Sequence, residues 1–111
     1  MKIIYPHSIS NCLGEKIVFK SITNDSGIDK VLLEAYLEPG CGPAMHTHFK
    51  QDESLTVISG EMMYQTLGEE PKPLREGESI LFKRGTPHKF WNSGDGILKC
   101  EGWISPVYSV V

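Results

Sequence analysis

Three histidines and one glutamate, in two short stretches of the chain, have the residue types and spacing of a metal site. His46 and His48 are separated by one residue, and Glu53 follows after four more. Residues i and i+2 of a strand share a face, so both imidazoles are expected in one space, which Glu53 rejoins after a bend at residues 49–52. His88 follows a Gly-Thr-Pro turn. Imidazoles with one carboxylate suit divalent iron, manganese, nickel, zinc or copper.

Three other residues offer donor atoms near this pattern, and we expect none of them to be a ligand. Asp52 is next to Glu53 but has the opposite strand phase. Cys41 is separated from His46 by a Gly-Pro turn, and a small buried side chain is the more common role of such a cysteine. His7 lies near the N-terminus, where a solvent-facing position is expected.

The two stretches, residues 40–60 and 77–92, resemble the two sequence motifs of the cupin superfamily. The positions that match are Gly40, His46, His48, Glu53 and Gly60 in the first motif, and Gly77, Gly85, His88 and Asn92 in the second. One position departs, because Lys83 stands where the family usually has proline. Sixteen residues separate the motifs, which is close to the family's shortest spacers.

The resemblance implies an all-β fold, the double-stranded β-helix or jelly-roll barrel. It also implies that His46, His48, Glu53 and His88 together hold a divalent transition metal inside the barrel. Similar proteins include dioxygenases acting on enediols and flavonols, oxalate-degrading enzymes, isomerases, lyases and sugar- or metabolite-binding modules. Short cupins of this kind also form homodimers by pairing edge strands, which covers exposed backbone groups.

The order of apolar residues and turns independently predicts the same fold class. Residues 30–38 alternate, with Val31, Leu33, Ala35 and Leu37 on one face, which is typical of a half-buried strand. Further strands are expected at residues 15–22, 54–58, 61–67, 73–75, 79–83, 88–92 and 97–104. No segment of helical length shows three-four periodicity without an interrupting glycine or proline, so a sandwich or barrel is predicted.

Strand phase also predicts the lining of the barrel. If Glu53 points inward, Leu55, Val57 and Ser59 should do so too, and Phe90 and Asn92 should accompany His88. The inner wall near the metal would then be mostly apolar, as in a typical small-molecule site. Asn92 is expected to hydrogen-bond its own turn. Trp91 has the phase opposite to His88 and is expected to pack between sheets or subunits, and Lys83, Arg84 and Lys89 are expected to form a solvated rim.

Composition limits the classes of partner and compartment. The 111 residues are one domain's worth, so residues 1–111 are expected to form a single domain. The formal net charge of −3 argues against a nucleic-acid partner, and no apolar run is long enough to span a membrane. The start lacks a secretory h-region, and the three cysteines, Cys12, Cys41 and Cys100, are an odd number. We therefore expect a cytoplasmic location.

Together these features favour a metal-dependent enzyme of the dioxygenase type that acts on a small organic substrate. A site of three histidines and one glutamate leaves one or two positions free for water, oxygen or substrate. Glu53 is the candidate catalytic base, because no separate acid or base is identifiable. A non-catalytic cupin that binds a sugar or metabolite is the first alternative, and a metal-dependent isomerase or lyase is the second.

Overall fold

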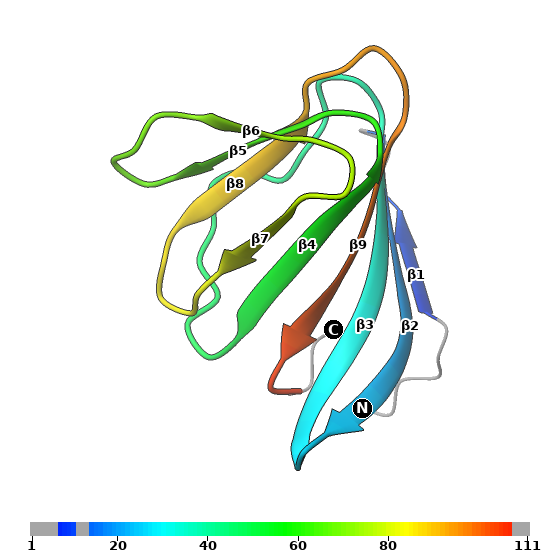
Figure 1. The fold of residues 1–111 in the computed structure, drawn as a ribbon, viewed down its shortest axis with the longest axis vertical. Helices are drawn as coiled ribbons and strands as arrows, with labels where there is room; N and C mark the ends of the chain where they lie inside the picture. Colours follow the sequence, from blue (N-terminus) through cyan, green and yellow to red (C-terminus); the bar gives the residue numbers. More distant parts are fainter. Residues whose placement is uncertain (1–6, 11–13, 108–111) are drawn as a thin grey trace.

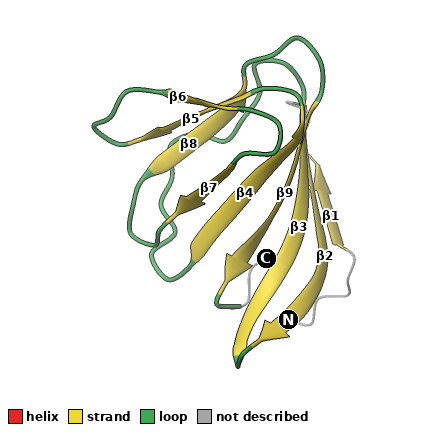
Figure 2. Ribbon diagram, viewed as in Figure 1, coloured by secondary structure: helices red, strands yellow, loops and turns green. Residues whose placement is uncertain are grey.

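The computed structural model describes residues 7–10 and 14–107, and every regular element in this part of the chain is a β-strand (Figure 2). The all-β prediction is therefore confirmed, and no helix that could cross a membrane occurs in the described ranges. The strands are β1 (His7–Ser10), β2 (Glu15–Asp25), β3 (Ile28–Leu37), β4 (Asp52–Ser59), β5 (Met62–Thr66), β6 (Lys72–Leu74), β7 (Ser79–Phe82), β8 (His88–Asn92) and β9 (Leu98–Ser105).

The strands form two antiparallel sheets, which Figure 1 shows as two layers. The larger sheet has the order β1-β2-β3-β9-β4-β7, and the smaller has the order β6-β5-β8. The last strand, β9, lies between β3 and β4, so the chain returns to the middle of the larger sheet after building the smaller one. This crossing of the chain between two sheets is the jelly-roll arrangement that the sequence predicts.

The loop after β3 runs along β8 and extends the smaller sheet. The amide of Gly40 donates to the carbonyl of Asn92, and the amide of Asn92 donates to the carbonyl of Cys41, each over 2.9 Å. Further along, His46 and His88 exchange two backbone hydrogen bonds, both 2.9 Å long. The loop is thus paired with β8 at both of its ends, which fixes its path across the mouth of the barrel.

Glycine is required where this loop passes closest to β8. A Cβ atom on Gly42 would lie 2.0 Å from the carbonyl oxygen of Phe90 and 2.7 Å from the Cα of Trp91. No side chain fits at such a distance, so the loop approaches β8 only because residue 42 has none.

The hydrophobic core lies between the two sheets and follows the predicted phase of β3. The four residues expected on one face of that strand are all buried, and they are Val31, Leu33, Ala35 and Leu37. Met62, Leu74 and Phe90 of the smaller sheet belong to the same cluster as these residues. In β4, Leu55 and Val57 are buried as predicted, but Ser59 is exposed. The prediction for Ser59 is wrong because the register between β4 and β9 shifts after Val57.

Asn92 closes the end of β8 from a fully buried position. Its side-chain amide donates to the carbonyl of Gly96 over 2.7 Å, and its oxygen accepts from the amide of Gly94 over 2.9 Å. The predicted hydrogen bonds to its own turn are thus confirmed. A third bond, from the same amide group to the carbonyl of Leu37 over 2.8 Å, is longer-range and ties β8 to the end of β3.

Gly102 marks the tightest approach in the larger sheet and gives a test of the fold. It lies between Leu33 of β3 and Leu55 of β4, and a Cβ atom there would lie 2.0 Å from the carbonyl oxygen of Ser54. We expect Gly102→Ala to lower the free energy of unfolding by about 2 kcal/mol or more in urea denaturation. Gly96→Ala is the matched control, because nothing lies within 4 Å of its Cβ and neither glycine has a positive φ.

The control substitution should change the free energy of unfolding by less than about 0.5 kcal/mol. Equal stabilities of the two variants would contradict the close approach of β9 and β4 at this point.

Candidate metal centre

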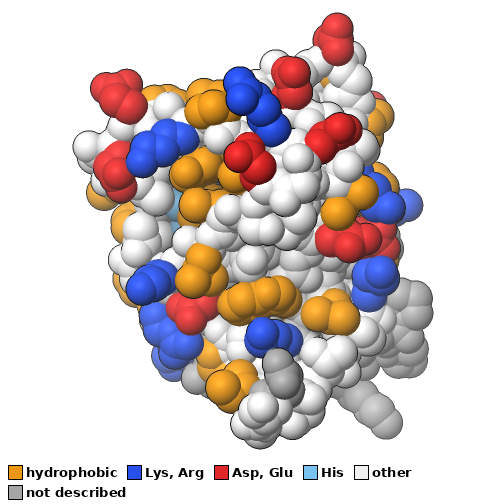
Figure 3. Space-filling model, viewed as in Figure 1, with side chains coloured by type: hydrophobic (Ala, Val, Ile, Leu, Met, Phe, Trp, Pro, Cys, Tyr) orange, Lys and Arg blue, Asp and Glu red, His pale blue; other side chains and the backbone are white. Residues whose placement is uncertain are grey.

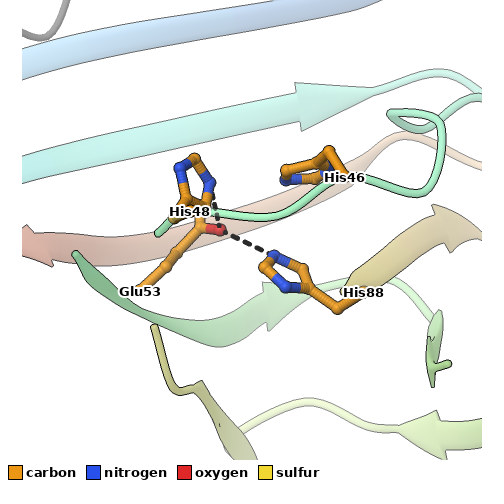
Figure 4. Close-up of side chains that lie close together, drawn as sticks. All are labelled: His46, His48, Glu53 and His88. Carbon is orange, nitrogen blue, oxygen red and sulfur yellow. Dashed lines mark hydrogen bonds and ion pairs between the residues drawn. The ribbon is translucent and has the colours of Figure 1, made fainter. Parts of the chain in front are cut away.

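The structure brings together the side chains of His46, His48, Glu53 and His88 (Figure 4). One donor atom from each of these residues lies within 4.8 Å of the donor atoms of all the others. Glu53 comes from β4 and His88 from β8, whereas His46 and His48 come from the loop between β3 and β4. Residues that are up to 42 positions apart in the sequence therefore meet at one point between the two sheets.

The local structure of the two loop histidines differs from the prediction. The sequence predicts a strand in which His46 and His48 point to one face, but only a single antiparallel bridge, between His46 and His88, forms here. Pro43, which has no amide hydrogen, interrupts regular pairing shortly before His46. The two rings nevertheless face one space, with their centroids 5.0 Å apart. His48 is held by its carbonyl, which accepts a 2.8 Å hydrogen bond from the amide of Gly85.

Two of the imidazoles are oriented in the same way, by a hydrogen bond from Nδ1 to a backbone carbonyl two residues earlier. The Nδ1 of His46 lies 2.7 Å from the carbonyl oxygen of Ala44, and the Nδ1 of His88 lies 2.9 Å from that of Thr86. A carbonyl oxygen only accepts hydrogen bonds, so each Nδ1 carries the hydrogen in these contacts. When the ring is neutral, the Nε2 of each histidine then presents a lone pair to a metal, whereas without a metal the Nε2 of His88 bonds to the Glu53 carboxylate only when it carries a hydrogen as well. Backbone carbonyls are typical partners for the outer nitrogen of a metal-binding histidine.

The ring of His88 is also fixed by stacking. Phe82 lies parallel to it, with 3.9 Å between the ring centroids and 3° between the planes. Phe82 is the cross-strand neighbour of Glu53, so the same pair of strands supports two of the four donors. His88 is only 1% exposed, which leaves its imidazole little freedom to turn.

The spacing of the donor atoms fits a single metal ion. Two atoms bound at ~2.1 Å to one metal lie roughly 3 to 4.2 Å apart, depending on the angle between them. The Oε1 of Glu53 lies 3.3 Å from the Nε2 of His88 and 3.5 Å from the Nε2 of His48. The widest separation in the group, 4.8 Å, exceeds this range by less than about 1 Å. The donor set is compatible with a divalent metal and does not select one element.

Charge interactions within the group are strong. Burial alone would raise the pKa of Glu53, but hydrogen bonds with His48 and His88 outweigh it and lower this pKa to about 2. The same contact raises the pKa of His48, although burial opposes the shift. Without a metal, the carboxylate is therefore charged and attracts a proton to His48. A divalent cation would take the place of that proton.

Asp52 is excluded from the group by a different partner. Its carboxylate accepts hydrogen bonds from the backbone amide of Arg84 at 2.8 Å, from Nε at 3.1 Å and from Nη2 at 3.2 Å. These bonds lower the pKa of Asp52. The preference for Glu53 over Asp52 thus agrees with the geometry. Arg84 is exposed, as expected for the rim, and its bonds to Asp52 also tie the turn after β7 to the start of β4.

Cys41 and Lys89, which the sequence predicts not to be metal ligands, lie outside the group of four donors. Cys41 is half-buried and is not among the described residues that converge at the site. Lys89 lies over the ring of Trp91, 5.2 Å from its centroid, so part of the predicted rim covers that half-buried aromatic ring. The side chain of His7 and the whole of Cys12 lie outside the described residues.

A cavity of about 330 Å³ adjoins three of the four donors. His46, His48 and Glu53 line one part of it, whereas His88 is buried and does not line it. The rest of the wall is mostly apolar, as predicted, and includes Ile17, Phe19, Leu33, Leu55, Phe90 and Ile104. Phe19 and Leu33, on β2 and β3, were not predicted as part of the site. The alternation of β3 places Leu33 on the inner face, but nothing in the sequence indicates that β3 lies opposite the histidines.

The chain belongs to the cupin domain family, whose model matches residues 33–105. That range contains all four donors and both motifs. The protein MJ1618 of Methanocaldococcus jannaschii, which carries the name "uncharacterized", is 30% identical over 83 residues. The match covers 75% of this chain and 66% of that protein, so the chain spans just under two thirds of that relative's length.

Two solved structures show how widely the fold is shared. KdgF from a Halomonas species has a TM-score of 0.76 and 17% identity, with 93% of this chain and 88% of that one covered. A conserved protein with a double-stranded β-helix domain, from Klebsiella pneumoniae, has a TM-score of 0.74 and 26% identity, with coverage of 88% and 82%. The low identity to KdgF means that this likeness shows the fold alone.

The charge on Glu53 makes the stability of the metal-free protein depend on pH. A folded-state pKa of about 2, against 4.5 in the unfolded chain, gives stability that is present above about pH 4.5 and is lost as the pH falls towards 2. Between about pH 6 and pH 3, we expect the free energy of unfolding of Glu53→Gln to fall by about 1 to 3 kcal/mol less than that of the unchanged protein. Urea denaturation in the presence of a chelator measures this difference.

Glu70→Gln is the control for this experiment, because Glu70 is exposed in the turn between β5 and β6. This variant should follow the unchanged protein across the whole pH range. If acid lowered the free energy of unfolding equally in all three proteins, the histidines would not stabilise the charged carboxylate of Glu53.

Proposed function

We propose that this cupin is a metal-dependent enzyme of the dioxygenase type that acts on a small organic molecule in the barrel. His46, His48, Glu53 and His88 hold a divalent transition metal, which is iron, manganese, nickel, zinc or copper. The observation that supports the proposal is the meeting of these four donors, within 4.8 Å of one another, beside a largely apolar cavity. A pocket of apolar walls with few convergent polar groups is the usual form of a small-molecule site.

The donor set suits an open metal site. Four protein donors leave one or two positions of a five- or six-coordinate ion for other ligands, and an open position distinguishes catalytic from structural metal sites. When bound, such an ion polarises an oxygen atom of the substrate as a Lewis acid or, if redox-active, reacts with oxygen.

Residues of this chain orient the imidazoles, surround a ligand with apolar side chains and provide a proton acceptor. The carbonyls of Ala44 and Thr86 hold two imidazoles in place, so little reorganisation is needed when a ligand arrives. The mostly apolar wall lowers the local dielectric around a bound ligand, which strengthens electrostatic effects on it. Glu53 lines the cavity as a charged carboxylate, and it can accept a proton from a substrate if it dissociates from the metal during turnover.

The proposal is tested by comparing two substitutions. His48→Ala removes one donor, whereas Asp52→Asn alters the neighbouring carboxylate that faces Arg84. We expect calorimetric titration to show one metal ion per chain, at least a tenfold loss of affinity in His48→Ala, and less than threefold change in Asp52→Asn. Affinity should also fall below about pH 6.5, because imidazoles coordinate only when neutral.

The same proteins then distinguish the classes of function. After anaerobic loading with iron(II), air and candidate enediols, flavonols or β-diketones are admitted while oxygen uptake is followed. Uptake that disappears in His48→Ala supports the dioxygenase. Turnover without oxygen uptake indicates an isomerase or lyase, and tight binding without turnover indicates a module that binds a sugar or other metabolite. If neither protein binds metal, every catalytic form of the proposal fails.

We also propose that the chain works as a cytoplasmic homodimer. Cys41 and Cys100 are free thiols, which suits a reducing compartment. β1 and β7 are the edges of the larger sheet, and an unpaired edge favours association with another strand. Figure 3 shows hydrophobic side chains between charged ones over the face where β3, β9 and β4 run side by side. Such a face can be covered when two copies associate through the adjacent edge.

Light scattering at micromolar concentration should give twice the mass of one chain. We expect Leu81→Lys, on edge strand β7 at a residue that is 45% exposed, to shift the protein towards the monomer. Leu67→Lys is the control, because Leu67 is 66% exposed but lies in the turn between β5 and β6. A monomer at this concentration, or equal effects of the two substitutions, would refute pairing through β7.

A further inference from the structure

We infer that the cavity selects a compact, largely apolar ligand with oxygen atoms at one end and at most one negative charge, located at that end. For the same reason, a substrate with a second anionic group, such as a dicarboxylate or a sugar phosphate, should bind poorly. The inference rests on the proposed metal site, because the metal fixes where the oxygen atoms lie. It names a chemical class of substrate, which the family and the fold leave open.

The cavity has two different ends. His46, His48 and Glu53 form the polar end, and the aromatic rings of Phe19 and Phe90 with aliphatic side chains form most of the remainder. Gln51 also lines the cavity, but it is uncharged and its side-chain amide donates to the carbonyl of Pro106 over 2.8 Å. Phe19 and Phe90 are less than 9% exposed and belong to the close-packed core, so this part of the wall offers a ligand apolar surface and no polar partner. The apolar part of a ligand gains free energy on entering this region, whereas a charged group there would lose its hydration.

The charge at the polar end limits the charge of the ligand. Neutral imidazoles, one carboxylate from Glu53 and a divalent ion carry a net charge of +1. One deprotonated oxygen of a ligand, such as that of an enol or a phenol, neutralises this charge. A second negative charge in the cavity would have to be balanced by another cationic group.

That second cationic group is not present among the described residues that line the cavity. The described basic side chains with clear partners are directed elsewhere. Lys20 and Lys99 pair with Glu34, which lies in β3 on the face opposite to its buried residues. Lys30 lies 4.3 Å from the ring centroid of Trp103 on the same outer face, and Arg84 binds Asp52.

The size of the cavity points to a compact ligand. Its volume of about 330 Å³ equals that of roughly ten water molecules in the liquid, which is near the lower limit for small-molecule sites. A single ring with a short substituent fits this volume. A carboxylate at the apolar end would lie there without a counter-ion, so we expect a ligand that carries one to lose tenfold or more in affinity.

Two probes of nearly equal size test the inference. 4-Methylcatechol and 3,4-dihydroxybenzoate share two adjacent hydroxyl groups and differ by a methyl or a carboxylate group at the far end. Zinc-loaded protein, which avoids redox chemistry, is titrated with each probe in a calorimeter. We expect 4-methylcatechol to bind at least tenfold more tightly. Equal affinities, tighter binding of the carboxylate, or no binding of either probe to protein with measured zinc would overturn the inference.

A substitution in the wall should change this preference. Ile17 lines the cavity from β2 and is only partly buried, so a longer side chain can be accommodated there. We expect Ile17→Lys to reduce the preference for 4-methylcatechol at least fivefold by supplying a counter-ion. Ile17→Met, which has a similar length without charge, should keep it. An unchanged ratio in a folded Ile17→Lys variant would contradict the charge argument.

Failure of the metal site can be separated from failure of this inference. If calorimetry shows no metal binding, the proposed function is wrong whatever the probes do. The two probes are then compared on metal-free protein by ligand-observed NMR. Without the metal, the polar end lacks the cation that attracts an anion, and the wall of the cavity is unchanged, so 3,4-dihydroxybenzoate should still bind more weakly than 4-methylcatechol. Equal saturation transfer to both probes would overturn the selection by charge as well.

Discussion

The site depends on the pairing of one irregular loop with β8. His46 in the loop and His88 at the start of β8 exchange two backbone hydrogen bonds, which place these two candidate ligands opposite each other. The same loop is anchored at its start by hydrogen bonds to Asn92, which itself is bound to the end of β3. Because Gly42 has no side chain, the loop can lie against β8 over this whole distance. The backbone, more than side-chain packing, therefore sets the separation of the histidines.

This arrangement explains how a buried carboxylate is tolerated beside the cavity. An isolated charge at this depth would be neutralised by protonation, since burial raises the pKa of a carboxyl group. At Glu53 the two imidazoles reverse that tendency and keep the carboxylate charged. The group is therefore prepared for a cation before any cation arrives. The Phe82 ring and the carbonyl of Thr86 hold His88 in the orientation that this requires.

Much of the fold and all four donors could be predicted from the sequence, because both leave local patterns. Alternation gave the buried face of β3, and the spacing of glycines and histidines indicated the family, which the match to the cupin domain confirms. What local patterns cannot show is pairing between distant segments. The strand expected at His46 and His48 is a loop, because only His46 pairs with β8, whereas His48 bonds to Gly85 in the turn before that strand. Ser59 was misplaced because a register shift depends on β9, which is forty residues away. The bond from Asn92 to Leu37 was missed for the same reason.

The two faces of the larger sheet divide charged from apolar residues in a way that bears on function. Along β3, Leu33 and Ala35 face the core, whereas Glu34 on the outer face binds Lys20, Lys99 and the hydroxyl of Tyr36. The basic side chains engaged there cannot also compensate an anion inside the barrel. Strand alternation thus places the charged side chains of β3 on the outer face of the sheet, and Glu53 is the one acidic side chain among the described residues that line the cavity. A ligand that enters such an interior is oriented by its own polarity, because only one of its ends finds a partner there.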